Sequence, residues 1–309
     1  MKSYNSQAGL IRGVHEAYCL YSNHLRHAED RVSTYVENLE KLEAFIGARL
    51  GIALEGMDIL DIGPGPFHVQ MIYFARKNRV LGVDTNVNPN RLDISRYLDM
   101  FRYNGVRRGL KTVGRKIAGI DRQYRKAVKS RLSLRSLPDR KVLRMDACNL
   151  TFPDSCFDFV HSRSVFHHLP IPAAAIDHIV RILRPGGIAY LSFQLFTSEN
   201  GSLDPRIFTS QKADVGLWPH LRPSLEKTIS PNAFLNKLRL SEWRQLFEER
   251  MPAVQFTLKT NPRPAAEADA LRLQKEGELR SNSLEELLTD EVAILWRKPA
   301  SDYSANRFA

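Results

Sequence analysis

Two acidic side chains and two glycines occur at the spacing that a nucleotide-binding loop requires. The apolar segment Met57–Leu60 predicts a buried strand that ends in Asp61, after which the chain turns through Gly63 and Gly65 into an apolar helix. A second predicted strand ends in Asp84, about twenty residues later. Glycines let the backbone approach a ligand closely, and an acid that closes the second strand can bind ribose hydroxyls. The run therefore predicts a β-α-β nucleotide-binding unit.

The glycine pair does not identify the nucleotide by itself. In a dinucleotide G-x-G-x-x-G series the third small residue would stand at position 68, which is a histidine here. An NAD(P) dehydrogenase on the same fold is therefore disfavoured, and the later segments must decide the ligand.

Those later segments follow in a definite order. Met145-Asp146-Ala147 comes after a short predicted strand at 142–145, and residues 152–160 read FPDSCFDFV, a fourth strand with its lead-in. His167-His168-Leu169 then precedes a predicted helix, and Arg184-Pro185-Gly186-Gly187 precedes a fifth strand at 188–193. This ordered set, beginning with Asp61-x-Gly63-x-Gly65, resembles the class I S-adenosylmethionine (SAM) dependent methyltransferases. The resemblance is closest to the methyltransferase type 11 group.

The resemblance implies an α/β fold. We expect a Rossmann-like seven-stranded sheet of order 3-2-1-4-5-7-6, with strand 7 antiparallel and helices on both faces. Strands six and seven would lie at 254–260 and 291–297, with a polar helical stretch at 265–289 between them. Residues 1–50 read as a helical cap, and 51–309 as the methyltransferase domain. That domain would carry a basic helical insert at 102–140, a loop-rich excursion at 194–235 and a helix at 235–250.

The resemblance also implies roles for single residues, with SAM as the cofactor. Asp61, Gly63 and Gly65 would hold its methionine end, and Asp84 would accept hydrogen bonds from both ribose hydroxyls. Asp146 would accept from the adenine amino group while the Ala147 amide donates to the ring. The family often has a third glycine where this chain has Phe67, so a large ring there is expected to reshape the pocket beside the methionine moiety.

A hydroxyl acceptor must lose a proton, and histidine is the usual general base near neutral pH. His167 and His168 follow strand four, on the side from which the acceptor is expected to approach, so they are the candidate catalytic residues. Packing beside the cofactor is their structural alternative. His161 and His220 are rival bases, and Asp158 is expected to be structural. We expect no metal, because adjacent histidines suit chelation poorly and no other His/Cys cluster has ligand spacing.

Basic residues concentrate in the insert. Between Arg102 and Arg144 there are 15 Lys/Arg against Asp121 and Asp139, a net charge of 15 − 2 = +13, whereas the whole chain carries +11. Apolar residues recur at helical spacing along this segment, at positions 103, 106, 110, 113, 117, 120 and 124, which predicts one amphipathic helix. Glycines at 105, 109, 114 and 119 oppose it. Three interpretations stay open: a lid or subunit contact, a helix on an anionic membrane surface, or a nucleic-acid surface.

The sequence thus predicts a SAM-dependent methyltransferase, with O-methylation of a glycan, glycolipid or other metabolite as the first hypothesis. The alternatives are an RNA methyltransferase that uses the basic insert, and a non-catalytic SAM-binding protein. Amino methyltransferases of adenine, cytosine or glutamine carry an Asn/Asp-Pro-Pro-aromatic motif after strand four, where this chain has Ser162-Arg163-Ser164. The difference argues against methylation of such amino groups. The N-terminal segment has no apolar run and the three cysteines have no paired spacing, so we expect a cytoplasmic protein. A peripheral position at the inner membrane face stays open because of the basic insert.

Overall fold

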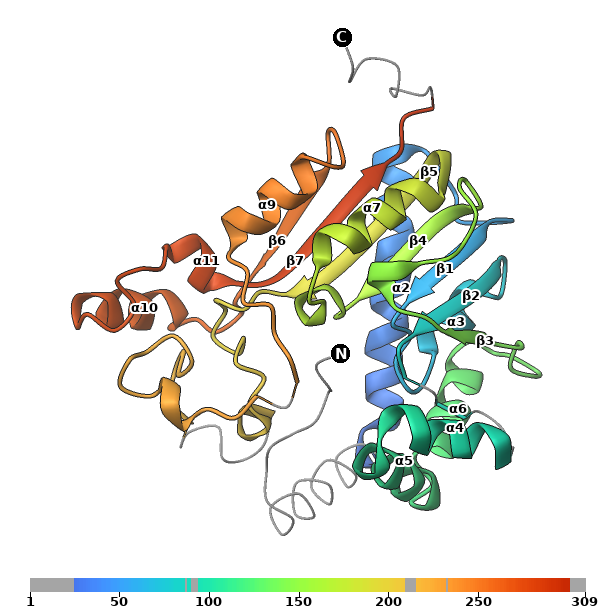
Figure 1. The fold of residues 1–309 in the computed structure, drawn as a ribbon, viewed down its shortest axis with the longest axis horizontal. Helices are drawn as coiled ribbons and strands as arrows, with labels where there is room; N and C mark the ends of the chain where they lie inside the picture. The colour runs from blue at the N-terminus through green and yellow to red at the C-terminus, as the bar shows by residue number, and fades with distance from the viewer. Residues whose placement is uncertain (1–24, 87, 90–93, 209–214, 232, 301–309) are drawn as a thin grey trace. The chain divides into compact units, whose positions relative to one another are not determined.

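The computed structural model describes residues 25–86, 88–89, 94–208, 215–231 and 233–300. The described backbone groups into two compact units, one up to residue 161 and one from residue 162 onward. Each unit is described by itself below, and Figure 1 labels the elements of both. Within the described residues, no helix is long and apolar enough to cross a bilayer.

The seven strands lie in the order β3-β2-β1-β4-β5-β7-β6, which confirms the predicted sheet. In the first unit β1 pairs in parallel with β2, and β2 with β3. In the second unit β7 runs antiparallel to both β5 and β6. The strand bounds are β1 Asp58–Ile62, β2 Arg79–Asp84, β3 Lys141–Arg144, β4 Phe157–Arg163, β5 Leu183–Gln194, β6 Gln255–Thr260 and β7 Thr289–Arg297.

The first unit begins with the long helix α2 (Ala28–Leu50), within the part of the chain predicted to be helical. Its buried residues recur every three or four positions, from Ala28 to Ile46, as an amphipathic helix requires. Gly51 ends it in the left-handed conformation and donates its N–H to the Gly47 carbonyl. The short helix α3 (Val69–Phe74) is buried along its whole length. Residues 1–24 of the predicted cap lie outside the described residues.

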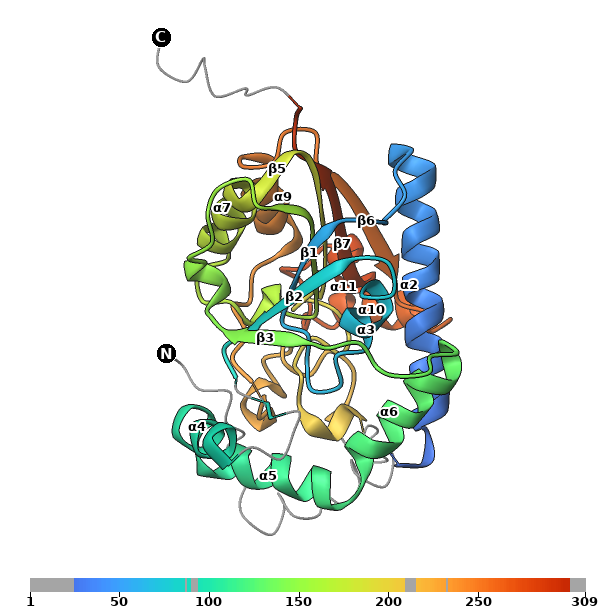
Figure 2. The same cartoon turned by 90° about the vertical axis from the view of Figure 1, so that its right-hand side faces the viewer.

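The basic insert is helical, as predicted, but it is divided into three helices. It forms α4 (Ile94–Asn104), α5 (Val106–Ile117) and α6 (Ile120–Arg131). Gly105 and Gly119 separate them with φ angles of 81° and 77°, values that side chains rarely adopt and that end a right-handed helix. Figure 2 shows α6 beside α2, and Arg131 at the end of α6 pairs with Glu40 in the middle of α2 at 3.0 Å. The three helices are therefore anchored at one end by α6.

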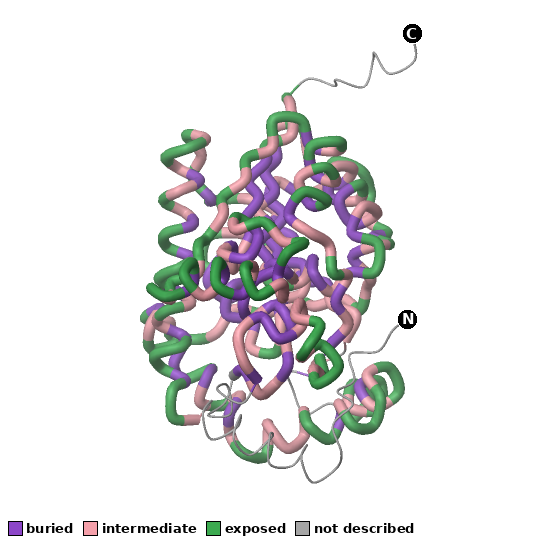
Figure 3. Tube along the Cα trace, turned by 90° about the vertical axis from the view of Figure 1, so that its left-hand side faces the viewer, coloured by how far each residue is buried: buried purple, intermediate pink, exposed green. Residues whose placement is uncertain are grey.

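The second unit holds β5–β7 and the helices α7 (Pro172–Ile182), α9 (Leu240–Glu248), α10 (Ala266–Lys275) and α11 (Leu284–Leu288). Helix α9 starts later than the predicted 235–250, because residues 235–239 are extended or irregular up to its cap at Arg239. The described residues of the excursion 194–235 include the short 3-10 turns Pro205–Phe208 and Glu226–Thr228. Buried residues concentrate along the strands in Figure 3, where they form the core.

Candidate functional site

The predicted cofactor residues of the first unit lie along one edge of its parallel strands. Ile62 is opposite Val83, and the Gly63 N–H donates to the Val83 carbonyl at 2.8 Å. Asp84 is opposite Arg144, and the Met145 N–H donates to the Asp84 carbonyl at 3.1 Å. Neighbouring strands are about 4.8 Å apart, so the loops after β1, β2 and β3 meet at their carboxyl ends. This is the edge at which open α/β sheets bind ligands.

Asp61 lies at the base of the glycine loop and is fully buried. Its Oδ1 accepts a hydrogen bond from Nδ1 of His161 at 2.8 Å, and the histidine is equally buried. Within the described part of the chain, Oδ2 of Asp61 has no hydrogen-bond partner. A buried carboxylate oxygen without a donor is costly, so a ligand that brings an N–H group would stabilise it. This unsatisfied oxygen fits the amino group at the methionine end of SAM.

Asp84 is held by the turn that follows β2. Its Oδ1 accepts from the backbone N–H of Asn86 at 2.8 Å and from the Asn86 side-chain amide at 3.0 Å. Burial raises the pKa of the Asp84 carboxyl above its ordinary value, and the two Asn86 hydrogen bonds oppose that rise. These contacts orient the carboxyl group that is expected to accept from the ribose, and the role of Asn86 is not visible in any sequence spacing.

Asp146 and Ala147 start a short turn after β3. Oδ1 of Asp146 accepts from the Cys148 N–H at 2.9 Å and caps the 3-10 helix Ala147–Asn149. Ala147 is buried. The local cap uses one oxygen of Asp146, and its second oxygen is the one that could serve an adenine amino group.

The glycine loop has an aromatic wall from the insert. Phe67 stacks on Tyr124 of α6, with ring centroids 3.7 Å apart and planes within 8°. Arg115 of α5 lies 5.3 Å from the Phe67 centroid. An added Cβ at Gly65 would meet no atom within 4 Å, so that side of the loop is open to a ligand. The ring of Phe67 therefore packs the insert against the glycine loop, while its predicted effect on the methionine pocket stays a prediction.

His68 follows in the left-handed conformation, with a φ of 54°, and it starts α3. The side chain is buried, and burial, reinforced by the charges of Arg140 and Arg115, lowers its pKa to about 4. His68 is therefore neutral at pH 7. A non-glycine residue in this conformation is uncommon and marks a position held by its surroundings.

The histidine pair belongs to the second unit, on the 3-10 turn Phe166–His168 that follows β4. The two rings are in contact, with centroids 4.0 Å apart. Nδ1 of His168 donates to the Phe234 carbonyl at 2.7 Å, which leaves the ring lone pair on Nε2. His167 is buried, and this burial holds its pKa well below the usual value, with a smaller effect from His168. A base that weak accepts a proton poorly, so His168 is the better candidate.

The rival base His220 is bound into the core of the second unit. Its Nε2 donates to the Phe196 carbonyl at 2.7 Å, and burial lowers its pKa to about 4. Trp218 is fully buried and donates to the Leu287 carbonyl at 3.3 Å. These residues of the excursion pack as a folded cap does, rather than presenting an aromatic acceptor surface. Asp158 accepts from the Asp58 N–H at 2.8 Å, consistent with its expected structural role.

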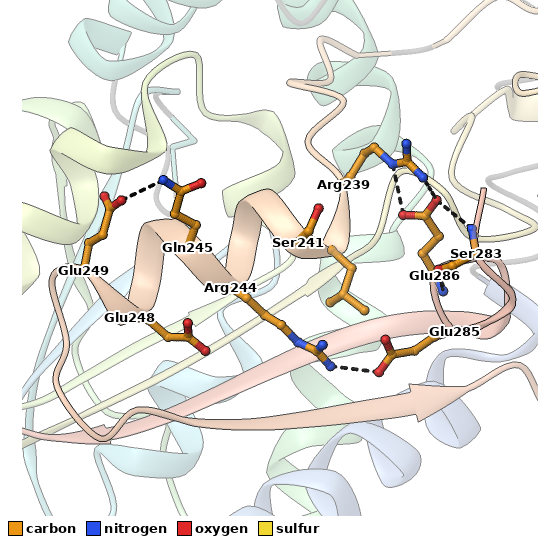
Figure 4. Close-up of a pocket in the computed structure, with 10 residues that line it drawn as sticks. Arg239, Ser241, Arg244, Gln245, Glu248, Glu249, Ser283, Glu285 and Glu286 are labelled. Atoms are coloured by element: carbon orange, nitrogen blue, oxygen red, sulfur yellow. Dashed lines mark hydrogen bonds and ion pairs between the residues drawn. The ribbon is translucent and has the colours of Figure 1, made fainter. Parts of the chain in front are cut away.

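The second unit also has a surface cavity of about 600 Å³ beside α9 and the start of α11. Figure 4 shows two ion pairs in this cavity: Arg239 binds Glu286, and Arg244 binds Glu285 at 2.8 Å. Because none of the predicted site residues lines it, we do not regard this cavity as the active site.

Comparison with known proteins identifies the fold family. Residues 104–191 match the type 11 family model described as "Methyltransferase domain". This segment is therefore similar to the methyltransferase domains of class I. The match includes Asp146, Ala147 and the histidine pair, while Asp61, Gly63, Gly65 and Asp84 precede it. It supports SAM as the cofactor, and the roles of the residues before position 104 stay predictions. No curated protein matches the chain.

Solved structures show a distant likeness. Phosphoethanolamine N-methyltransferase 2 of Haemonchus contortus is 17% identical, with a TM-score of 0.45, over 84% of this chain and 52% of that one. A SAM-dependent methyltransferase of Methanosarcina mazei is 14% identical, with a TM-score of 0.43, over 80% of this chain and 94% of that one. Likenesses at this level carry no argument about the substrate of this methyltransferase domain.

Proposed function

We propose that the protein is a SAM-dependent methyltransferase whose acceptor is a hydroxyl group of a glycan, glycolipid or other metabolite. The observation that carries the proposal is the set of acidic groups on one edge of the first unit: Asp61 with an unsatisfied buried oxygen, Asp84 held by Asn86, and Asp146 after β3. These groups fit the amino, ribose and adenine ends of one SAM molecule. The family match on residues 104–191 supports the same cofactor.

When bound, SAM supplies a methyl group that its sulfonium already activates. The protein therefore has to position the reacting groups, and such positioning can contribute about 7–11 kcal/mol. Asp61 and Asp84 would fix the two ends of the cofactor, and an ionised Asp84 can accept two charge-assisted hydrogen bonds. The open face at Gly65 lets the ligand approach the backbone.

We assign the proton-accepting role to His168. Its Nδ1 hydrogen bond to Phe234 sets the tautomer that presents Nε2 as an acceptor. General-base catalysis of this kind contributes about 10²–10⁴-fold. His168→Gln should therefore lower kcat by about 10²-fold and leave SAM affinity unchanged. His167→Gln is the matched control, because that buried histidine is a poor base at neutral pH.

The proposal is tested with methyl-labelled SAM, the full-length protein and a lysate of the source cells, fractionated into lipid, polysaccharide, RNA, protein and small-molecule pools. Asp84→Ala serves as the inactive control. Label in the lipid, polysaccharide or small-molecule pool that requires intact Asp84 supports the proposal. Label in RNA would favour the alternative function, for which the exposed cations Arg122, Arg125, Lys126 and Lys129 of α6 provide a phosphate-binding face. SAM binding without labelling of any pool would favour a non-catalytic protein.

A further inference from the structure

The exposed apolar side chains of the protein are gathered on two helices of the insert. Eight large apolar residues of the described chain are exposed, and six of them lie on α4 and α5. Single exposed apolar residues are normal on soluble proteins, but a contiguous group marks an interaction surface. The five that matter here are Ile94 (81% exposed), Leu98 (66%), Val106 (65%), Leu110 (59%) and Ile117 (81%), called the insert face below.

These residues share one side of their helices. At about 100° per residue, Val106, Leu110 and Ile117 fall within about 40° on α5, and Ile94 and Leu98 do so on α4. Gly109 of α5 packs against Phe101 of α4, whose ring would lie 2.5 Å from an added Cβ, so the two helices are in close contact. Met100, on the opposite side of α4, is fully buried. The insert face is thus additional to the surface by which α4 and α5 are packed.

Helix α5 is anchored by polar contacts as well. Arg115 binds Asp121 at 2.6 Å and Asn88 at 3.2 Å, and Lys116 donates to the Pro89 carbonyl. Both cations are mostly buried. The orientation of α5 is therefore determined on its inner side, and the apolar residues are directed outward by the same geometry.

Positive charge surrounds the insert face. Arg107 and Lys111 are exposed beside the apolar stripe of α5, and Arg102 is exposed on α4 on the same side as Leu98. Residues 94–131 contain 12 Lys/Arg against Asp99 and Asp121, a net charge of 12 − 2 = +10. Asp121 pairs with the mostly buried Arg115 and Lys116, and the other residues of 94–131 carry ten Lys/Arg against Asp99, a net charge of 10 − 1 = +9.

We propose that the insert face docks on an anionic phospholipid bilayer, with α4 and α5 in the plane of the interface. The apolar side chains would enter the acyl boundary and the flanking cations would lie among the headgroups. An apolar stripe edged with Arg and Lys is the arrangement that binds such surfaces. The charge of the face complements anionic lipid at about 1 kcal/mol for each cation near the surface.

Other occupants fit less well. A second copy of this face would bring two strongly positive surfaces together. Residues 1–24 contain Lys2 and Arg12 against Glu16, a net charge of 2 − 1 = +1, and so do not complement the face. Nucleic acid matches the charge but has no use for aliphatic side chains, and the aromatic rings here are engaged: Tyr103 lies under Arg144, and Tyr124 on Phe67.

The test is co-sedimentation of the full-length protein with vesicles of phosphatidylcholine alone and of phosphatidylcholine mixed with phosphatidylglycerol. We expect binding to the mixed vesicles only, weakening as salt is raised above about 0.1 M. Leu110→Ser/Ile117→Ser should lower the partition coefficient by more than about 100-fold. Arg107→Gln/Lys111→Gln should lower it by about 30-fold, as two lost cations imply.

Matched controls come from the second unit. Ile171→Ser/Leu271→Ser removes two exposed apolar residues, and Lys227→Gln/Lys275→Gln removes two exposed cations; neither should change vesicle binding. Unchanged binding by both insert variants would overturn the proposal, as would absent binding by the unaltered protein. Binding of RNA without vesicles, or dimer dissociation by Leu110→Ser/Ile117→Ser, would equally overturn it. Because vesicle binding needs no methyl transfer, this test is independent of the proposed function.

Discussion

The buried pair of Asp61 and His161 permits a sharp prediction. Both side chains are essentially inaccessible, and His161 donates a hydrogen bond to the Asp61 carboxylate at 2.8 Å. His161→Leu would leave that carboxylate buried without this donor. Breaking a buried pair in this way costs about 3–5 kcal/mol, a large share of the 5–15 kcal/mol that stabilise a typical domain. We expect this loss in urea unfolding measured at pH 7.5.

The same variant should weaken SAM binding, because Asp61 would no longer be oriented. We expect the dissociation constant from calorimetry to rise by more than about tenfold, or 1.4 kcal/mol. Phe159→Leu is the matched control: it removes a buried ring that packs beside His161 and lowers stability, but it keeps the hydrogen bond and should keep SAM affinity. A loss of stability below about 1 kcal/mol in His161→Leu would refute the reasoning. Unchanged SAM affinity would refute the positioning role.

Three further outcomes are expected. Tyr124→Ala should weaken SAM binding in calorimetry because Phe67 loses its stacking partner, whereas Tyr124→Phe keeps the ring and should bind normally; equal binding by both would show that the stack does not shape the loop. SAM affinity should fall on acidification at a higher pH than an ordinary aspartate would cause, because the pKa of Asp84 is raised, and Asp84→Asn should abolish this dependence. His68 and His220 each have a pKa of about 4 in the folded protein, against a value near 6.5 in the unfolded chain. Each therefore stabilises the folded protein fully above about pH 6.5, and up to roughly 3 kcal/mol of this stabilisation is lost progressively toward pH 4. A free energy of unfolding in urea that stays constant from pH 7 to 4.5 would contradict this.

Strand order and the positions of the motif residues could be predicted from the sequence because they depend on local signals. Strands one to five are short apolar runs, each followed by a turn or a functional residue, and this order determines which loops meet. The ends of the elements were less predictable. Helix α9 begins at Leu240 rather than 235, because a cap and extended residues precede it and apolar spacing alone does not reveal them.

The basic insert shows what periodicity cannot decide. Its apolar residues keep helical spacing across Gly105 and Gly119, yet both glycines adopt positive φ and divide the segment. The apolar stripe is thereby separated into an exposed part on α5 and a buried part on α6, where Ile120 and Tyr124 are covered. The hydrophobic pattern of a sequence predicts that a helix has an apolar face, but it does not show whether that face is buried in the same protein or left exposed for a partner.

The candidate site has the same limit. His161 was visible only as a histidine at the end of a strand, and nothing in the sequence connects it to Asp61, 100 positions earlier. Likewise, the sequence shows Asn86 only as a turn residue, and the folded structure is needed to show that its backbone and side-chain N–H groups both donate to Asp84. Residues that orient other side chains do so through contacts that form only in the folded chain, so no sequence motif with a fixed spacing identifies them.

The inner contacts of α5 link the proposed membrane face to the cofactor loops. Arg115 donates to Asn88, and Asn88 donates to the Pro66 carbonyl of the glycine loop at 3.0 Å. Arg115 also lies beside Phe67, while Lys116 holds Pro89 in the loop after β2. A bilayer that fixes the outer side of α5 would therefore restrict both loops that are expected to hold SAM. If docking orders these loops, anionic vesicles should lower the SAM dissociation constant, and Leu110→Ser/Ile117→Ser should remove this effect while leaving affinity without vesicles unchanged.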